Sequence, residues 1–362
     1  MKRFNKAAMI CMAICASVFS GCANKEAEVE VIPETVCIYS YGEELENRMQ
    51  YVLEAHPDWQ GKIEFVTLSE EEYDLTLNKC FYPEEKKGKK DETEQEQPPL
   101  KYPDIFLTDA KHLPQYAASD KVLSMEELGI TGDIFDQMYD WSLKSATIED
   151  SGIMALTWRV SPEAFIYKKS MASEYLGADE RRDVQAYVKD QLTLDDSLLA
   201  IKKAAGRDIR VLDDASMYET ESMRSNIFGF YADVDWLTKV FKDDKKLTLS
   251  ETWGVCKGYR PEVTRADEWL LVTRDCVNKD FTSDVLKALC LDESILKKIN
   301  EETYDFVNNK KVMSNAFHTS KGKLEVLGNE DYIEVFDRQV SRSIPEVLLP
   351  GDADMKEDAD GE

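Results

Sequence analysis

The sequence contains few residues of the kinds that bind metal ions, and it lacks the short motifs of common nucleotide-dependent enzymes. Its only histidines are His56, His112 and His318, so a histidine metal site is not expected. It has no P-loop, no H-E-x-x-H motif and no glycine-rich dinucleotide fingerprint. Beyond the N-terminus, no stretch is long and apolar enough to span a bilayer. We therefore expect neither a metal nor a cofactor.

Positive charge is also scarce in this chain. Lys and Arg number 45 against 71 Asp and Glu, which gives a formal net charge of −26. Nucleic acids are bound through Lys and Arg that neutralise phosphates, so no nucleic-acid partner is expected. The same balance argues against a body that lies flat on anionic lipid. With 362 residues, 43% of them hydrophobic, the chain is globular in composition and long enough for two lobes.

The cysteines do not form a disulfide framework. Of the eight in the chain, five follow Cys22, and their odd number and wide spacing match neither paired bridges nor a C-x-x-C metal knuckle. Cys37 and Cys290 lie inside apolar segments, which favours buried thiols. The other three are Cys80, Cys256 and Cys276.

The N-terminus has the layout of a secretory signal. A basic start is followed by the apolar run 7–19 and by the small residues Ser20 and Gly21 directly before Cys22. This arrangement resembles a bacterial lipobox, although Phe19 stands where that pattern usually has Leu. An ordinary N-terminal core helix is the alternative, but it would carry polar residues at helical spacing.

The lipobox resemblance implies that residues 1–21 are a signal peptide and that Cys22 is acylated, with palmitate among the chains. Two acyl chains hold a protein firmly to a membrane. Residues 22–34 would then form a lipidated tether on the extracytoplasmic side of the cell membrane.

The first ordered segments predict a βαβ unit. "TVCIYSY" (35–41) is an apolar run typical of a buried strand. An amphipathic helix follows, and "KIEFVTL" (62–68) is a second strand. A strand, a helix and a strand in about 35 residues predict a parallel sheet covered by helices.

Further strands are predicted at 102–110, 163–169, 226–232 and 269–275, and a helix at 283–302. Residues 82–99 and the acidic tail 349–362 have almost no apolar side chains, so both are expected to be disordered.

Five blocks of the sequence, taken in order, resemble landmarks of one family, the extracellular solute-binding proteins (family 1) of ABC sugar importers, in its lipoprotein form. They are "YPDIFLTDAKHLPQYAASDKVLSMEELGIT" (102–131), "GIMALTWRVSPEAFIYKKSMASEYLG" (152–177), "NIFGFYADVDW" (226–236), "ETWGVCKGYR" (251–260) and the helical block 278–313. The resemblance implies a class II periplasmic-binding-protein-like α/β fold. Each of its two lobes would be a mainly parallel sheet flanked by helices, and the lobes would be joined by crossing segments.

Family alignment suggests crossings near Val160, Gly258 and Val307. Lobe 1 would comprise 35–159 plus 259–306, and lobe 2 would comprise 160–258 plus 307–348. Lobe 2 would be shorter than in relatives around 207–225. The resemblance further implies a monomer that captures a small solute, a carbohydrate, and delivers it to ABC permease subunits without chemistry of its own.

The same resemblance implies a set of cleft residues. Sugars are bound by aromatic faces that pack on C–H surfaces and by carboxylates, amides and Arg that take the hydroxyls. The aromatic residues have core packing as their alternative role, Asp109 could cap a helix, and Glu43 could be a favourable acid in a first helical turn. The positions that match the family's motifs are Tyr41, Glu43, Asp109, Trp158, Arg159, Tyr231, Asp235, Trp236, Arg265 and Trp269.

The sequence also departs from the family's pattern. "TRADEW" (264–269) replaces a glycine-containing aromatic turn, so two glycines that would let the backbone approach a ligand have become Ala266 and Asp267. Arg159 and Arg265 could instead favour an acidic sugar, because guanidinium pairs bidentately with carboxylate. Solvated surface arginines are the simpler interpretation of both.

Two other functions remain open at this stage. A degenerate surface lipoprotein would keep the fold without transport. More remotely, "GVCKG" (254–258) has the spacing of a nucleophile elbow, with Cys256 as the nucleophile and His318 downstream, as in a cysteine hydrolase.

Overall fold

The computed structural model describes residues 35–82, 101–177, 184, 203, 206, 209–212, 215–220, 226–243, 252–257, 264–266, 268–317, 325–327 and 330–345. The predicted signal peptide, Cys22, the tail 349–362 and all of the loop 82–99 except Tyr82 lie outside these residues, as does His318. Within the described residues, no helix combines the length and the apolar character needed to cross a membrane.

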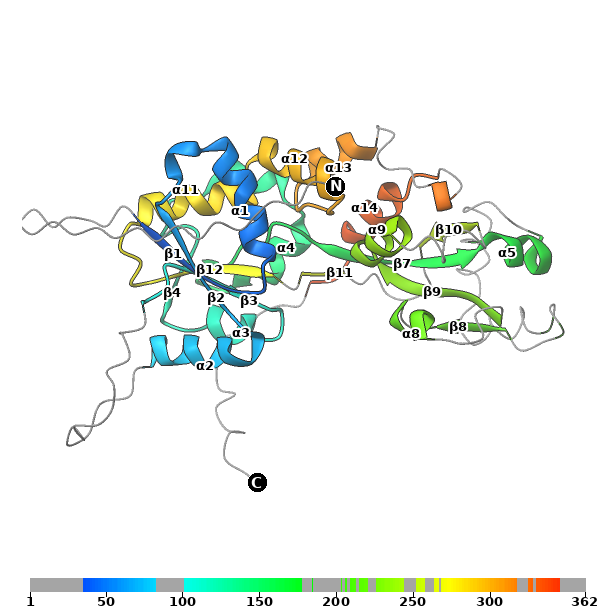
Figure 1. Ribbon diagram of the computed structural model, residues 1–362, viewed down its shortest axis with the longest axis horizontal. Coiled ribbons are helices and arrows are strands. Elements are labelled where there is room, and N and C mark those ends of the chain that lie inside the picture. Colours follow the sequence, from blue (N-terminus) through cyan, green and yellow to red (C-terminus); the bar gives the residue numbers. More distant parts are fainter. Residues whose placement is uncertain are drawn as a thin grey trace, which may run out of the picture. The chain divides into compact units, whose positions relative to one another are not determined.

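The first sheet contains the predicted βαβ unit. Helix α1 (Glu44–Ala55) joins β1 (Val36–Tyr41) to β2 (Ile63–Leu68), and the two strands pair in parallel. The sheet order is β2-β1-β3-β12-β4, and β1 also pairs in parallel with β3 (Ile105–Thr108). Figure 1 shows α1 and α11 (Lys279–Cys290) on one side of this sheet, and α2 (Glu70–Phe81) and α3 (Leu113–Ala117) on the other. The apolar side chains of β1 are therefore buried on both faces, as predicted.

The other half of this sheet is antiparallel. Strand β12 (Trp269–Thr273) runs antiparallel to both β3 and β4 (Val122–Leu123). It enters after β11 (Thr264–Arg265), which pairs in a different sheet, so β12 is not joined to its neighbours by a βαβ crossover. Without that connection, nothing constrains the strand to run parallel.

The second sheet has the order β10-β7-β9-β8, with β11 paired to β7. Its central strand β7 is antiparallel to β9, β10 and β11, and among the strands that the structure describes in this sheet only β8 and β9 pair in parallel. The prediction of a mainly parallel sheet is therefore wrong here. Apolar runs such as "EAFIYKK" show that a strand is buried, but they carry no information on its direction. The strands are β7 (Ser161–Lys168), β8 (Arg210–Leu212), β9 (Ile227–Asp233) and β10 (Trp253–Cys256).

The helix predicted at 283–302 is two helices. The helix α11 (Lys279–Cys290) ends before Asp292, and α12 (Glu293–Thr303) begins after it. The carboxylate of Asp292 accepts hydrogen bonds from the backbone N–H groups of Ser294 (2.9 Å) and Ile295 (3.0 Å). Asp292 is thus an N-cap, and its side chain satisfies donors that would have no partner inside the helix.

The remaining elements are short. They are α2 (Glu70–Phe81), α3 (Leu113–Ala117), α4 (Asp140–Ser145), α5 (Lys169–Leu176), α8 (Ala215–Thr220), α9 (Val234–Asp243), α13 (Lys310–Phe317), α14 (Ile333–Val340), a small ribbon of β5 (Thr147–Ile148) and β6 (Gly152–Ile153), and the 3₁₀ turns Pro57–Trp59, Gly132–Gln137 and Glu325–Leu327.

Two of the predicted crossing segments lie side by side. Arg159 and Val307 form an isolated antiparallel bridge. The backbone N–H of Val160 donates to the carbonyl oxygen of Phe306 (3.2 Å), and the backbone N–H of Asn308 donates to the carbonyl oxygen of Trp158 (2.8 Å). The segment 158–160, which leads into β7, therefore runs antiparallel to the segment 306–308 and is hydrogen-bonded to it. The third crossing, near Gly258, lies outside the described residues.

Candidate functional site

A cavity of about 640 Å³ opens at the carboxyl ends of β1 and β3. Tyr41 ends β1 and Glu43 follows it, while Thr108 ends β3 and Asp109 follows it. In open α/β sheets, ligands bind beyond the carboxyl ends of the strands, where chain segments diverge. The structure thus brings four of the predicted site residues to one cavity: Tyr41, Glu43, Asp109 and the buried Trp158.

Carboxylates dominate the wall of this cavity. Among the described residues that line it, none is Lys or Arg, and the only residue able to carry a positive charge is His112. Two acids come from helix α2, two surround the start of α1, one follows β3 and one precedes β12. The six are Glu43, Glu44, Glu70, Asp74, Asp109 and Glu268.

His112 lies between two of these acids. Its Nδ1 is 2.9 Å from Asp109 Oδ1, and its Nε2 is 3.9 Å from Asp74 Oδ2. The backbone N–H of His112 also donates to Asp109 Oδ1 (2.8 Å), and that of Leu113 donates to the carbonyl of Asp109. Asp109 therefore holds the turn before α3 and also lines the cavity, whereas the N-cap position of α3 is His112.

The aromatic part of the cavity is a pair of tyrosines. The rings of Tyr41 and Tyr73 meet edge to face with centroids 5.0 Å apart. Tyr73 is held from behind, because its hydroxyl donates to the carbonyl of Leu107 (2.6 Å) and accepts from the N–H of the same residue (3.0 Å). Burial raises the pKa of Tyr73 well above its ordinary value, so it stays a neutral phenol. Tyr41 is half-buried and lines the cavity.

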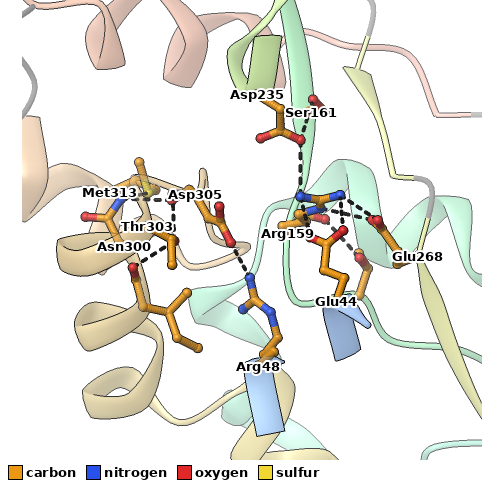
Figure 2. A network of polar contacts seen from close by, with 12 residues as sticks. Glu44, Arg48, Arg159, Ser161, Asp235, Glu268, Asn300, Thr303, Asp305 and Met313 are labelled. Atoms are coloured by element: carbon orange, nitrogen blue, oxygen red, sulfur yellow. Dashed lines mark hydrogen bonds and ion pairs between the residues drawn. The ribbon is translucent and has the colours of Figure 1, made fainter. Parts of the chain in front are cut away.

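Arg159 does not point at an open cavity but at carboxylates of the protein itself (Figure 2). Its guanidinium lies 2.7 Å from Glu44 and 3.4 Å from Asp235, and its Nε donates to Glu268 at 3.0 Å. Burial disfavours the charged guanidinium, but these carboxylates more than offset that cost and raise the pKa of Arg159. Arg159 is thus paired with acids of the protein itself, which weakens the sequence argument for an acidic ligand.

A second buried arginine lies beside this network. Arg48 on α1 pairs with Asp305 at 2.7 Å, and its guanidinium carbon lies 5.0 Å from the centre of the Trp158 ring. Burial lowers the pKa of Arg48, partly opposed by Asp305. Trp158 also lines the cavity, although none of its surface is exposed, and its indole N–H has no hydrogen-bond partner among the described residues.

The other predicted site residues lie away from the cavity wall. Tyr231 is buried against Phe165, with ring centroids 5.4 Å apart. Trp269 is buried and donates from its indole N–H to Ala266 (2.8 Å). For both, the structure shows the core packing that was their alternative role.

Trp236 and Arg265 are the last two predicted positions. Trp236 at the start of α9 packs edge to face on Phe230 with centroids 5.0 Å apart. Arg265 is largely exposed and pairs with Glu163 on the neighbouring strand β7 at 3.2 Å. Like Tyr231 and Trp269, neither is among the residues that line the cavity.

Several residues of the site were not predicted. Glu70 and Asp74 lie one turn apart on α2, and Glu44 and Glu268 pair with Arg159. The sequence carries a weak signal for the first pair, since "SEEEYD" follows a strand and begins a helix that covers the cleft edge. It carries none for Glu268, which lies 109 residues from its arginine partner.

The cysteine hydrolase is not supported by the position of Cys256. The thiol is fully buried at the end of β10. In the antiparallel pairing of β10 with β7, residue Cys256 lies opposite Phe165. Packing explains why position 254 is a glycine, because a Cβ there would lie 2.2 Å from Tyr167 Cζ. Among the described residues, no group of three His, Cys, Asp or Glu could hold a metal ion.

The fold is that of the two-lobe periplasmic binding proteins. Solved structures with this fold include an extracellular solute-binding protein of family 1, with a TM-score of 0.64, 12% identity, and coverage of 87% of this chain and 88% of that one. The sugar-binding protein MalE of Xanthomonas citri gives 0.63 and 13%, covering 87% of each chain. The cyclic alpha-maltosyl-1,6-maltose binding protein of Arthrobacter globiformis gives 0.58 and 12%, with 87% and 88% covered.

No protein-family model and no curated protein matches the chain. At these identities the likeness establishes the fold alone, and it is the two-lobe α/β fold that the family resemblance implied.

Proposed function

We propose that this protein captures a small carbohydrate on the extracytoplasmic side of the cell membrane and delivers it to an ABC importer. The observation that carries the proposal is the cavity at the carboxyl ends of β1 and β3, where an aromatic ring and several carboxylates converge. An aromatic face for C–H surfaces and carboxylates that accept hydroxyl protons are the groups that sugar recognition needs. The protein would be held to the membrane by acyl chains on Cys22 and would act as a monomer without a cofactor.

The proposed action is closure rather than chemistry. Lobe 1 would comprise 35–159 plus 259–306 and lobe 2 would comprise 160–258 plus 307–348, and the paired crossing segments would act as the hinge between them. The pairing of β11 with β7 supports a return of the chain to lobe 1 after residue 265 rather than near Gly258. A solute that contacts both lobes would favour the closed state, and the closed state would be the form that the permease subunits recognise.

A thermal-shift screen followed by isothermal titration tests the proposal. A solute that binds only the native state must raise the melting temperature, so a panel of neutral, amino and acidic sugars should contain at least one stabilising member. Tyr41→Ala should abolish that shift. Tyr82→Ala is the matched control, because Tyr82 is 54% exposed and does not line the cavity.

A surface lipoprotein that has lost transport is the second candidate. It is favoured by the burial of Trp158, Tyr231 and Trp269, which leaves fewer aromatic faces for a sugar than the sequence suggests. If the folded protein binds no member of the panel, this second candidate replaces the first.

A further inference from the structure

We propose that Arg48 is a positioning residue of the hinge, which fastens the crossing segments 158–160 and 306–308 to α1, the helix that begins at the cavity. The inference rests on the proposed function for the hinge and for the solute, whereas the contacts of Arg48 are independent of it. Arg48 does not line the cavity, so its effect on a solute acts through other residues.

The guanidinium of Arg48 makes one contact at each crossing segment. Its Nη2 donates to Asp305 Oδ2 at 2.7 Å, directly before the segment 306–308 (Figure 2). Its central carbon lies 5.0 Å from the centre of the Trp158 ring, in the segment 158–160. Within the described part of the chain, the guanidinium has no other hydrogen-bond or ring partner. These two contacts therefore join both crossing segments to a single residue of α1.

Helix α1 connects these contacts to the cavity. Glu43, Glu44 and Leu45 line the cavity at the start of the helix, and Arg48 lies about one turn after Glu44. Leu45 and Met49 are fully buried, so the core holds this part of the helix in place. A displacement of the start of α1 is then passed to the crossing segments, because one packed helix carries both sets of contacts.

The chemistry of the pair suits a positioning role. The side chain of Arg48 is 3% exposed, and burial lowers its pKa, partly opposed by Asp305. A buried ion pair often stabilises a protein no more than apolar residues of similar volume would. What it adds is geometry, since the charge must meet Asp305 while the planar group lies over the Trp158 ring. Position is therefore the main contribution of this arginine.

The second crossing segment also has an anchor of its own. The fully buried side chain of Asn308 donates to the carbonyl oxygen of Thr157 (3.0 Å) and accepts from the backbone N–H of Tyr139 (3.1 Å). These bonds join the two segments to each other, but they do not reach α1. Loss of Arg48 should therefore loosen the crossing segments locally without unfolding the protein.

Amide hydrogen exchange of the solute-free full chain, without its signal peptide, tests this role. Arg48→Met keeps much of the side-chain volume and removes the charge. We expect the amides of Val160 and Asn308, which bond across the two segments, to exchange at least about tenfold faster in this variant. The amides of Leu156 and Leu270, which donate to each other's carbonyl oxygens, should change by less than about threefold. Equal acceleration of all four amides would overturn the role of Arg48.

Three further variants keep this test decisive. Arg274→Met makes the same substitution at a half-exposed pair with Glu127, and should leave all four amides within about twofold. Arg48→Lys keeps a cation for Asp305 and should accelerate the two crossing amides less than Arg48→Met does. If Arg48→Met does not fold, Asp305→Asn replaces it with the same expected pattern, because it removes the charge at the other end of the pair and retains an oxygen acceptor.

Isothermal titration tests the connection to the cavity. The probes are maltotriose, glucosamine and galacturonic acid, which are a neutral, an amino and an acidic sugar. A probe that the unmodified protein binds should bind Arg48→Met at least about fivefold more weakly and Arg274→Met equally well. The loss is expected because a loosened cavity wall must be ordered again on binding. Unchanged affinity in Arg48→Met, or no binding of any probe, would overturn the connection to a solute.

The two measurements separate this inference from the proposed function. A bound sugar together with equal acceleration of the four amides supports carbohydrate capture and overturns the inference. Selective acceleration at Val160 and Asn308 without any bound sugar supports the fastening of the crossing segments by Arg48 and argues against the proposed function.

Discussion

Arg159 and Asp235 form an ion pair, with 3.4 Å between Nη1 and Oδ2 (Figure 2). Arg159 lies on the segment that leads from the first sheet into β7, and Asp235 lies on helix α9, which follows strand β9 of the second sheet. The same guanidinium pairs with Glu44 at the start of α1 and with Glu268 just before β12. One side chain therefore connects elements attached to both sheets. Arg159 is 9% exposed, so these contacts are screened little by solvent.

Replacement of Arg159 should destabilise the protein strongly. Arg159→Gln leaves the poorly exposed carboxylate of Glu268 without the guanidinium that pairs with it, and should lower the free energy of unfolding by about 3 kcal/mol or more. Urea denaturation measures the loss. Arg274→Gln is the control, because its pair with Glu127 is half-exposed and should contribute less than about 1 kcal/mol. Comparable losses in the two variants would contradict this role.

The break between α11 and α12 should depend on one side chain. Asp292→Ala removes the cap from two backbone N–H groups and should cost about 1 kcal/mol, with faster hydrogen exchange confined to the first turn of α12. Asp292→Asn retains an acceptor and should cost a few tenths of a kcal/mol. If the alanine and asparagine variants are equally stable, the cap contributes nothing.

The buried thiols should make the protein lose stability in alkali. Burial raises the pKa of Cys37 to about 12 and that of Cys276 to about 11, from an ordinary value of 9.0. Above pH 9 the unfolded chain releases these protons and the native state retains them. The free energy of unfolding should therefore fall by about 1.4 kcal/mol per pH unit for each thiol, until pH reaches its native pKa.

Denaturation at pH 7 and pH 10.5 measures this dependence. The fall between the two values should be smaller in Cys37→Ala with Cys276→Ala than in the unmodified protein. A variant that falls as steeply as the unmodified protein would show that other groups, such as buried tyrosines, cause the effect.

The location of the protein should depend on Cys22. Cys22→Ser should shift the protein from the membrane fraction to the aqueous phase in a detergent partition, because the proposed acyl chains would supply the anchor. Cys80→Ser is a suitable control, since Cys80 lies within the folded body and has no proposed lipid. Retention of Cys22→Ser in the membrane fraction would exclude lipid anchoring at this residue.

Cys256 should be inert. Because the thiol is fully buried in β10, Cys256→Ala should leave solute binding unchanged, and a thiol reagent should not label Cys256 in the native protein. Rapid labelling at this residue, or hydrolysis that the variant abolishes, would revive the hydrolase hypothesis.

Local pattern was sufficient for the elements. The apolar run of β1, the amphipathic spacing of α1 and the second strand are confirmed because each depends on neighbours in the chain. The direction of β12 and of the strands around β7 was not predictable, because an apolar run has the same composition in either direction. The division of 283–302 into two helices was signalled by Asp292, but helical spacing on both sides concealed it.

For the site, the sequence placed Tyr41, Glu43 and Asp109 correctly at the ends of two strands, since parallel neighbours bring those ends together. Whether they bind a solute remains a prediction. The sequence could not show which aromatic rings are exposed, because Trp158 and Tyr231 look alike in their motifs and differ from Tyr41 only in what packs over them.

The sequence by itself determined the α/β character, the strongly acidic balance and the motif that predicts a lipid anchor, because these depend on composition and short-range order. Only the tertiary structure decided which side chains meet at the cavity and which acids pair with Arg159. Arg159 is far in the chain from Glu44 and Glu268. Only the folded structure brings them together, so that the guanidinium pairs with acids of the protein itself. Glu70 and Asp74 on α2 join the same cavity wall because the fold brings that helix beside the carboxyl ends of β1 and β3.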